Sequence, residues 1–262
     1  SEEDFERRPE FTEPEILRTN LAAVILQMIS LGLGDIAEFP FLQPPDSRGV
    51  KDGLDLLTEL GAIQSGTLRD GRRAPSSGSE NADGTLRDGL RPPQGAAASR
   101  SLRDREAIVS KGAAPTITKI GRKLARLPID PRLGRMVIES GKHGVTREVM
   151  AIVAGLSIQD PRERPLEKRP QADQSHARFT DKSSDFITLL NLWNYLKKQE
   201  KELSGNQFRR AYKAEYLNYL RVREWGDVNR QLTRMAKQLD LTVGQPSTDA
   251  TAIHRSLLAG LL

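Results

Sequence analysis

The stretch ITKIGRKLARLPIDPRLGRMV, residues Ile117 to Val137, decides the fold. Apolar residues at helical spacing stand on both sides of a pair of prolines: Ile120, Leu124 and Leu127 before it, Leu133, Met136 and Val137 after it. Pro128 and Pro131 end one helix and start the next, because proline lacks the amide of a helix interior but fits a first turn. Two packed units should meet at this elbow. The pattern alone also fits a helix, an elbow and a helix in any α-rich protein.

Upstream of the elbow, the sequence predicts two helices. Apolar residues at helical spacing over residues 17–28 indicate the first, which ends at Gly32. Asp46 or Ser47 can cap the second, because short polar side chains accept the free amides of a first turn. Gly61 ends the second helix.

Two short β-prone pieces, residues 62–64 and 116–118, follow these helices and can pair as a hairpin. Helix, helix and hairpin is the outline of a winged helix, which we predict for residues 13–127. Residues 1–12 are too polar and too short to form a domain of their own, so we interpret them as a connecting segment.

Between the two β-prone pieces, residues 65–114 are rich in Gly, Pro, Ser and Arg. GTLRDG occurs at Gly66–Gly71 and again at Gly84–Gly89, and the related SLRDRE occurs at Ser101–Glu106. Such a segment buries too little apolar surface to offset its chain entropy. We predict a disordered insertion at the tip of the wing. An arginine-rich RNA-binding tail is the alternative, although acidic residues nearly balance the basic ones.

Residues 128–262 are predicted to form a helical bundle. Helices are expected over 132–142 and 146–155, after a cap at Ser183 or Ser184, after a capping box of Ser204 and Gln207, and over 218–241. The third carries Phe186 to Leu196, and the fourth carries Phe208, Tyr212 and Leu220. The segment DPRERPLEKRP, residues 160–170, is predicted to be a surface loop. The bundle aromatics fall at core spacing, so we interpret them as core rather than as base-stacking surface.

Composition bounds the class of protein. The chain has 262 residues, 37% apolar and 29% charged, with no Cys. It can therefore build one large or two ordinary domains without disulfides or thiolate metal sites, and no run has the length of a membrane span. The net charge of +5 is uneven: residues 196–237 hold 11 Lys and Arg against 5 Asp and Glu. A polyanion partner should bind the C-terminal helices.

The sequence lacks the motifs of phosphoryl transfer. No GxxxxGK[ST] occurs, and the nearest piece, Gly141-Lys142-His143, has no glycine loop before it. There is no DEAH tetrad, so this chain alone should not hydrolyse ATP. His143, His176 and His254 are scattered without ligand spacing, and we interpret each as a surface or capping residue.

Several stretches carry a resemblance to a known family: SEEDFERRPEFTEPEILRTNL (1–21), LTELGAI (57–63), ITKIGRKLARLPIDPRLGRM (117–136), SDFITLLNLW (184–193) and REWGDVNRQL (223–232). In them the chain resembles the region after the motor of DEAH-box RNA helicases, specifically the bacterial HrpA type. Only the segment around 65–114 is unmatched. The match is incomplete elsewhere, because Tyr212, Glu215 and His143 stand where many relatives have Cys, Asn and Cys.

The resemblance implies a piece of an ATP-dependent RNA helicase, a mainly α chain. Residues 1–12 would leave the second RecA-like lobe, 13–127 would form the winged helix, and 128–262 would form a ratchet-like bundle cut before an OB-fold. ATP and Mg would bind in the motor and not in this chain. Partners would be single-stranded RNA, or DNA, and the RecA-like lobes of the same protein. A cytoplasmic monomer without membrane contact is expected.

One-sided basic helix faces are candidates for phosphate binding. Arg209, Arg210 and Lys213 lie three and four apart on one helix, and Arg221 with Arg223 begins the next. Charge alone favours an ordinary solvated face. The resemblance reverses this preference, because in the resembling helicases the ratchet lines the path of single-stranded RNA. The nucleic-acid-binding residues that we predict are Arg178, Ser184, Arg209, Arg210, Lys213 and Arg221.

Two other functions fit parts of the pattern. A winged-helix DNA-binding regulator would need a basic recognition helix in the major groove. The corresponding helix, residues 47–60, carries Arg48 and Lys51 among more acidic residues, which suits DNA poorly. A structural adaptor that docks proteins through the bundle would show no affinity for nucleic acid.

Overall fold

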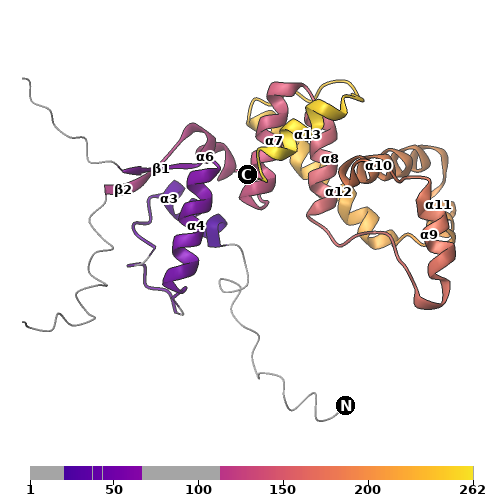
Figure 1. Ribbon diagram of the computed structural model, residues 1–262, viewed down its shortest axis with the longest axis horizontal. Coiled ribbons are helices and arrows are strands. Elements are labelled where there is room, and N and C mark those ends of the chain that lie inside the picture. Colours follow the sequence, from indigo (N-terminus) through magenta and orange to yellow (C-terminus); the bar gives the residue numbers. More distant parts are fainter. Residues whose placement is uncertain (1–20, 37, 43, 67–112, 262) are drawn as a thin grey trace, which may run out of the picture. The chain divides into compact units, whose positions relative to one another are not determined.

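The computed structural model describes residues 21–36, 38–42, 44–66 and 113–261. Within these ranges the chain is mainly helical, as predicted, with one two-stranded sheet (Figure 1). The connecting segment predicted for residues 1–12, and residues 67–112 of the predicted insertion, lie outside the described residues. None of the described helices is long and apolar enough to cross a membrane.

Two packed helices open the described part of the chain. Helix α3 spans Leu21–Leu31 and packs against α4, Ser47–Glu59. Asp46 is the N-cap of α4 and accepts the Gly49 amide, which confirms the predicted cap. Close packing needs Gly53, because a Cβ there would lie 2.7 Å from the Ile25 side chain. Gly61 follows α4 at φ +67°, a left-handed conformation that glycine adopts without strain.

The predicted hairpin pairs, and its strands are longer than the sequence indicates. Strand β1 spans Ile63–Gly66 and β2 spans Ala113–Ile117. The segment 65–114 therefore includes the ends of both strands. The Thr118 hydroxyl donates to the Gly61 carbonyl at 2.6 Å and so holds the end of β2 against the end of α4. The order helix, helix, hairpin is confirmed, and the winged-helix assignment stays a prediction.

The proline elbow forms as predicted. Helix α6 spans Lys119–Leu124 and is capped by Thr118. Helix α7 spans Pro131–His143, and Asp130 caps it by accepting the Arg132 amide at 2.8 Å. Pro131 occupies the first turn, where its missing amide leaves no internal hydrogen bond unmade.

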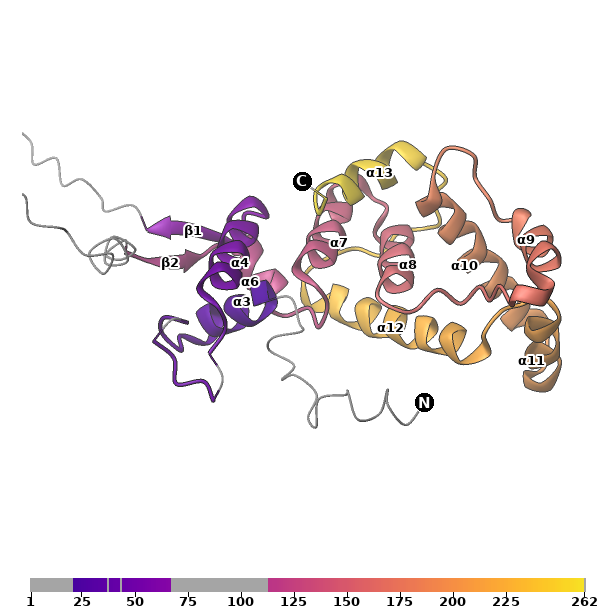
Figure 2. The ribbon, with the colours of Figure 1, turned by 60° about the horizontal axis from the view of Figure 1, so that its bottom comes forward.

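Helix α8, Thr146–Leu156, lies at the centre of the bundle. Every residue from Val149 to Gly155 is buried, so the helix is covered on all faces. It packs against α7, α10 (Asp185–Glu202), α12 (Tyr219–Gln238) and α13 (Ala250–Leu258). Figure 2 shows α8 with these helices around it. Trp225 on α12 is fully buried, and its indole donates to the Ala151 carbonyl at 2.8 Å.

The segment that follows α8 differs from the prediction. The sequence predicts a loop over residues 160–170, but Leu166–Lys168 form a 3₁₀ turn (η1) and α9 spans Arg169–Ala177. Sequence periodicity misses α9, because it buries only Ala172 and His176 and so has no apolar stripe. Pro170 lies in its first turn.

The C-terminal caps are those predicted, with one helix boundary corrected. Ser184 caps α10, and the Ser204 and Gln207 capping box opens α11, Gly205–Ala214. The helix predicted over 218–241 forms as α12, and the structure adds that Asn218 caps it. The assignment of Leu220 to the helix opened by Ser204 is wrong. That helix ends at Ala214, and Leu220 is 70% exposed in the first turn of α12.

Two glycine substitutions test the packing of α8 against Trp225. A Cβ at Gly155 would lie 2.7 Å from Trp225 Cζ2, so Gly155→Ala should lower the free energy of unfolding by about 1–3 kcal/mol through overpacking. At Gly226 of α12, a Cβ would meet only the tips of Arg230 and Lys197, at 3.5 and 3.9 Å. Gly226→Ala should therefore raise the free energy of unfolding by roughly 0.5–1 kcal/mol, because alanine favours a helix more than glycine does. Denaturant unfolding measures both, and equal effects of one sign would contradict this packing.

Candidate nucleic-acid interface

Helix α11 presents its basic residues to solvent. Arg209, Arg210 and Lys213 are exposed, whereas Tyr212 is fully buried and Phe208 is half-buried. The Phe208 and Tyr212 rings stack with centroids 4.1 Å apart on the inward side. The cations therefore occupy one face of the helix and the aromatic rings the other, as the sequence predicts.

The three cations of α11 differ in how they are held. The Arg209 guanidinium lies 4.7 Å over the ring of Tyr219, the first residue of α12. Among the residues that the structure describes, Arg210 and Lys213 form no ion pair. These two charges are thus available to an anion, while Arg209 is also fixed at the boundary between α11 and α12.

A hydrogen-bonded junction joins the α11–α12 connection to the segment after α8. Arg162 pairs with Leu217 in an isolated antiparallel bridge. On either side, the Glu163 amide donates to the Tyr216 carbonyl and the Asn218 amide to the Pro161 carbonyl, each at 2.8 Å. The connection turns sharply, because Tyr216 has φ 56°. Residues distant in sequence are thereby held at one place, with the charged side chains of both segments around them.

The structure places Arg178 and Arg221 at this junction. Arg221 donates to the Asp160 carbonyl at 3.0 Å. Arg178 pairs with Glu215 at 2.7 Å and lies 4.4 Å over the Tyr195 ring. Because each guanidinium has more donors than these contacts use, both can bind a further anion in a fixed orientation.

Ser184 has a structural position. Its Oγ accepts the Ile187 amide at 3.3 Å as the cap of α10, and it lies 2.6 Å from His254 Nε2. The residue is 9% exposed. Its predicted contact with nucleic acid is not tested by this arrangement.

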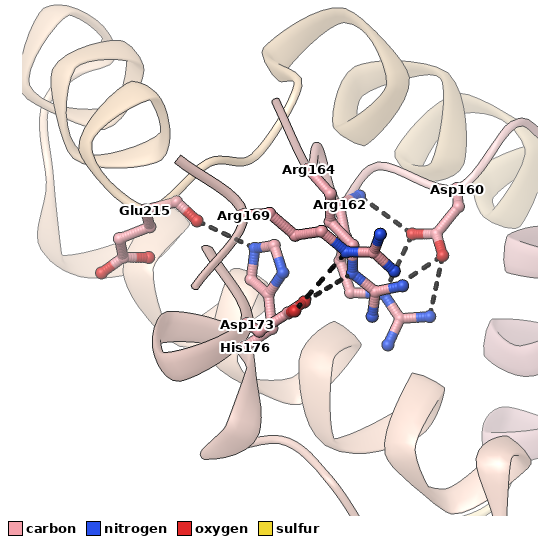
Figure 3. A network of polar contacts seen from close by, with 7 residues as sticks. All are labelled: Asp160, Arg162, Arg164, Arg169, Asp173, His176 and Glu215. Carbon is pink, nitrogen blue, oxygen red and sulfur yellow. Dashed lines mark hydrogen bonds and ion pairs between the residues drawn. The ribbon is translucent and has the colours of Figure 1, made fainter. Parts of the chain in front are cut away.

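Three arginines that sequence reasoning did not select also lie at the junction. Figure 3 shows them between two aspartates: Arg162 with Asp160 on one side, Arg164 and Arg169 with Asp173 on the other. Burial alone would raise the pKa of Asp160, but its hydrogen bonds from Arg162 outweigh burial and lower it. The sequence does show a high density of arginine in residues 160–170. This segment was predicted only to be a surface loop, so its arginines were not selected as candidate site residues.

The interpretation of His176 as a surface or capping residue is wrong. His176 is 3% exposed and its Nε2 lies 3.0 Å from the Glu215 carbonyl (Figure 3). That contact requires a proton on Nε2, since a carbonyl can only accept. Burial lowers the pKa of His176, and the nearby charges of Arg162 and Arg164 lower it further. A neutral imidazole thus joins α9 to the end of α11.

No group of three or more His, Asp or Glu side chains in the described ranges could hold a metal ion. The other two histidines are half-buried: His143 lies 3.8 Å from Glu139 on α7, and His254 contacts Ser184. The interface is therefore built from arginine, lysine and aromatic groups, which suit phosphate and base contacts.

Part of the bundle matches a known protein family. Residues 130–189 match the family described as "Helicase associated domain (HA2), ratchet-like". The match begins at Asp130, the cap of α7, and ends within α10. The bundle thus contains a ratchet-like helicase-associated domain.

The chain is also similar over its whole length to bacterial helicases. It is 48% identical over 262 residues to the ATP-dependent RNA helicase HrpA of Escherichia coli and 44% identical to the HrpA homolog of Haemophilus influenzae. Over 260 residues it is 24% identical to the "Probable ATP-dependent RNA helicase DHX35" of Homo sapiens, and covers 29% of that protein. It spans 17% of the length of each bacterial relative. The predicted resemblance to HrpA-type helicases is confirmed.

The buried His176 should make stability depend on pH. Its pKa is lowered in the folded chain, so below the ordinary value near 6.5 the unfolded chain binds the proton more readily. The free energy of unfolding should therefore be highest above that pH and fall as the pH decreases below it. In His176→Gln, whose side-chain amide can still donate to the Glu215 carbonyl, the fall should be smaller. Urea unfolding at a series of pH values measures both, and parallel curves would contradict the assignment.

Proposed function

We propose that this chain guides single-stranded RNA within an ATP-dependent RNA helicase. The observation that carries the proposal is the one-sided face of α11, where Arg209, Arg210 and Lys213 are exposed on a helix whose other side is packed. The ratchet-like match and the similarity to HrpA support it.

The chemistry of this face suits a backbone rather than a sequence. Lys and Arg side chains bind phosphates by releasing condensed counterions, which supplies affinity to any strand. Arg178 and Arg221 are held in place by Glu215 and by the Asp160 carbonyl, so they lose little side-chain freedom on binding. Arg210 and Lys213, which form no ion pair with any described residue, would let a strand slide, while the fixed arginines at the junction would define its path.

The motor function belongs to the rest of the proposed helicase. ATP and Mg would bind in the RecA-like lobes, which are proposed partners of this chain, because the sequence has no phosphate cradle. The chain would act as a cytoplasmic monomer unit, clamping RNA while those lobes hydrolyse ATP.

The winged-helix DNA-binding alternative is less well supported. On α4, Arg48 and Lys51 are exposed, but so are Asp52, Asp55 and Glu59. A phosphate backbone would meet more negative than positive charge on this helix, so it suits a major groove poorly.

The basic face can be tested by reversing its charge. Replacing Arg209, Arg210 and Lys213 together with Glu should weaken binding of oligouridylate and of mixed-sequence RNA alike, since phosphate contacts carry no base information. The salt dependence should also flatten, by roughly 0.7 in log–log slope for each phosphate that the variant no longer binds. Fluorescence anisotropy at several salt concentrations measures both.

The matched control is a second triple variant with the same change in charge. Arg132, Arg147 and Arg255 are exposed on α7, α8 and α13, and replacing them with Glu should leave most of the affinity. Equal losses in the two variants would mean that only net charge matters. A lowered melting temperature confined to the α11 variant would make its cations structural instead.

Because ATP is proposed to bind only in the RecA-like lobes, we expect the isolated chain not to hydrolyse ATP. Purified alone, it should show no RNA-stimulated ATPase activity, because nothing in its sequence can hold a triphosphate with its metal. A coupled phosphate-release assay with and without oligouridylate measures this. ATP turnover that follows the protein peak through a second purification would contradict it.

A further inference from the structure

A cavity of about 280 Å³ lies between α10, α11 and α12. Three aromatic residues line it: Trp193 from α10, Phe208 from α11 and Tyr219 from α12. Phe208 and Tyr219 pack against the core but are only half-buried, and their ring centroids lie 6.2 Å apart with the rings nearly perpendicular. The expectation that the bundle aromatics are core holds for the fully buried Trp225, and also for Phe208, which packs against the core while it lines the cavity.

Cations line the same cavity. Lys197 lies 4.7 Å over the Trp193 ring, Arg223 lies 6.0 Å from the Tyr219 ring, and Arg230 extends from the next turn of α12. Lys197 and Arg230 pair with exposed carboxylates, at Glu200 and Asp227, whereas Arg223 forms no ion pair with any described residue. A ligand with an aromatic plane and a negative charge would match both sets of groups.

Two further features indicate an unfilled site rather than a finished core. Tyr212 lines the cavity, and its buried hydroxyl has no hydrogen-bond partner among the described residues. Gly226 also lines it, and a Cβ there would meet only the ends of Arg230 and Lys197. At Gly226 of α12 there is thus space that a larger side chain would fill by entering the cavity.

The cavity and the basic residues of α11 are connected through Tyr219. Tyr219 lines the cavity, and the guanidinium of Arg209 lies 4.7 Å from the centroid of the Tyr219 ring. A strand whose phosphates follow α11 would therefore pass the cavity.

We infer that this cavity binds one unstacked base of the single-stranded RNA, held against the aromatic rings that line the cavity, with its phosphate near Arg223. The inference rests on the proposed function. Every base has an aromatic face, so such a site would hold a base without selecting its identity. The site would also hold the strand at defined positions, because a base must leave the cavity each time the strand advances.

The test uses the whole chain and an oligouridylate that carries a single 2-aminopurine, whose fluorescence is quenched by stacking. Binding should quench the probe, and anisotropy reports total affinity separately. Gly226→Leu fills the cavity while keeping every cation, so it should abolish the quenching and weaken binding by about tenfold, the loss of one stacked base. Circular dichroism and melting check that this variant is folded.

A second measurement needs no substitution and therefore does not depend on how Gly226→Leu folds. An oligouridylate containing 4-thiouridine, irradiated in complex with the unchanged chain, should cross-link to peptides that contain Phe208 or Tyr219. Cross-links found only elsewhere would overturn the inference and leave the proposed function standing, as would full quenching in Gly226→Leu. Failure of the unchanged chain to bind RNA would overturn both.

Discussion

The burial of α8 is the constraint on which the rest of the bundle depends. A helix that is apolar on all faces cannot be stable in water until other helices cover it. Helices α7, α10, α12 and α13 do so, and the indole of Trp225 fixes α12 to the Ala151 carbonyl. Because these helices cover α8, α11 does not take part in covering it and packs against α10 and α12 instead. Its outer face is therefore free to carry charge.

The polar junction turns this arrangement into a defined surface. Residues 160–164 and 215–218 are joined by backbone hydrogen bonds, and the neutral His176 holds the end of α11 from the side of α9. Buried hydrogen bonds of this kind are expensive to break, so they keep nearby side chains in one orientation. Arg178 and Arg221 gain their fixed positions in this way, whereas Arg210 and Lys213 form no ion pair with any described residue.

Local patterns predicted much of this fold, and distant contacts account for what they missed. Caps such as Asp46, Ser184 and the Ser204 box depend on residues within a turn, so the sequence shows them directly. Helix α9 has almost no apolar periodicity, and the burial of His176 depends on a residue 39 positions away. A pattern within a short stretch of sequence could therefore reveal neither α9 nor the burial of His176. The family resemblance supplied the function class and could not say which arginines meet at the junction.

RNA is proposed to bind along α11 and the junction beside it. Hydrogen exchange of the chain with and without saturating oligouridylate tests this most directly, because it locates the bound strand without altering any residue. We expect added protection in residues 160–164, in α11 and in the first turns of α12. Protection confined to α4 or α13, or no difference between the two states, would contradict it.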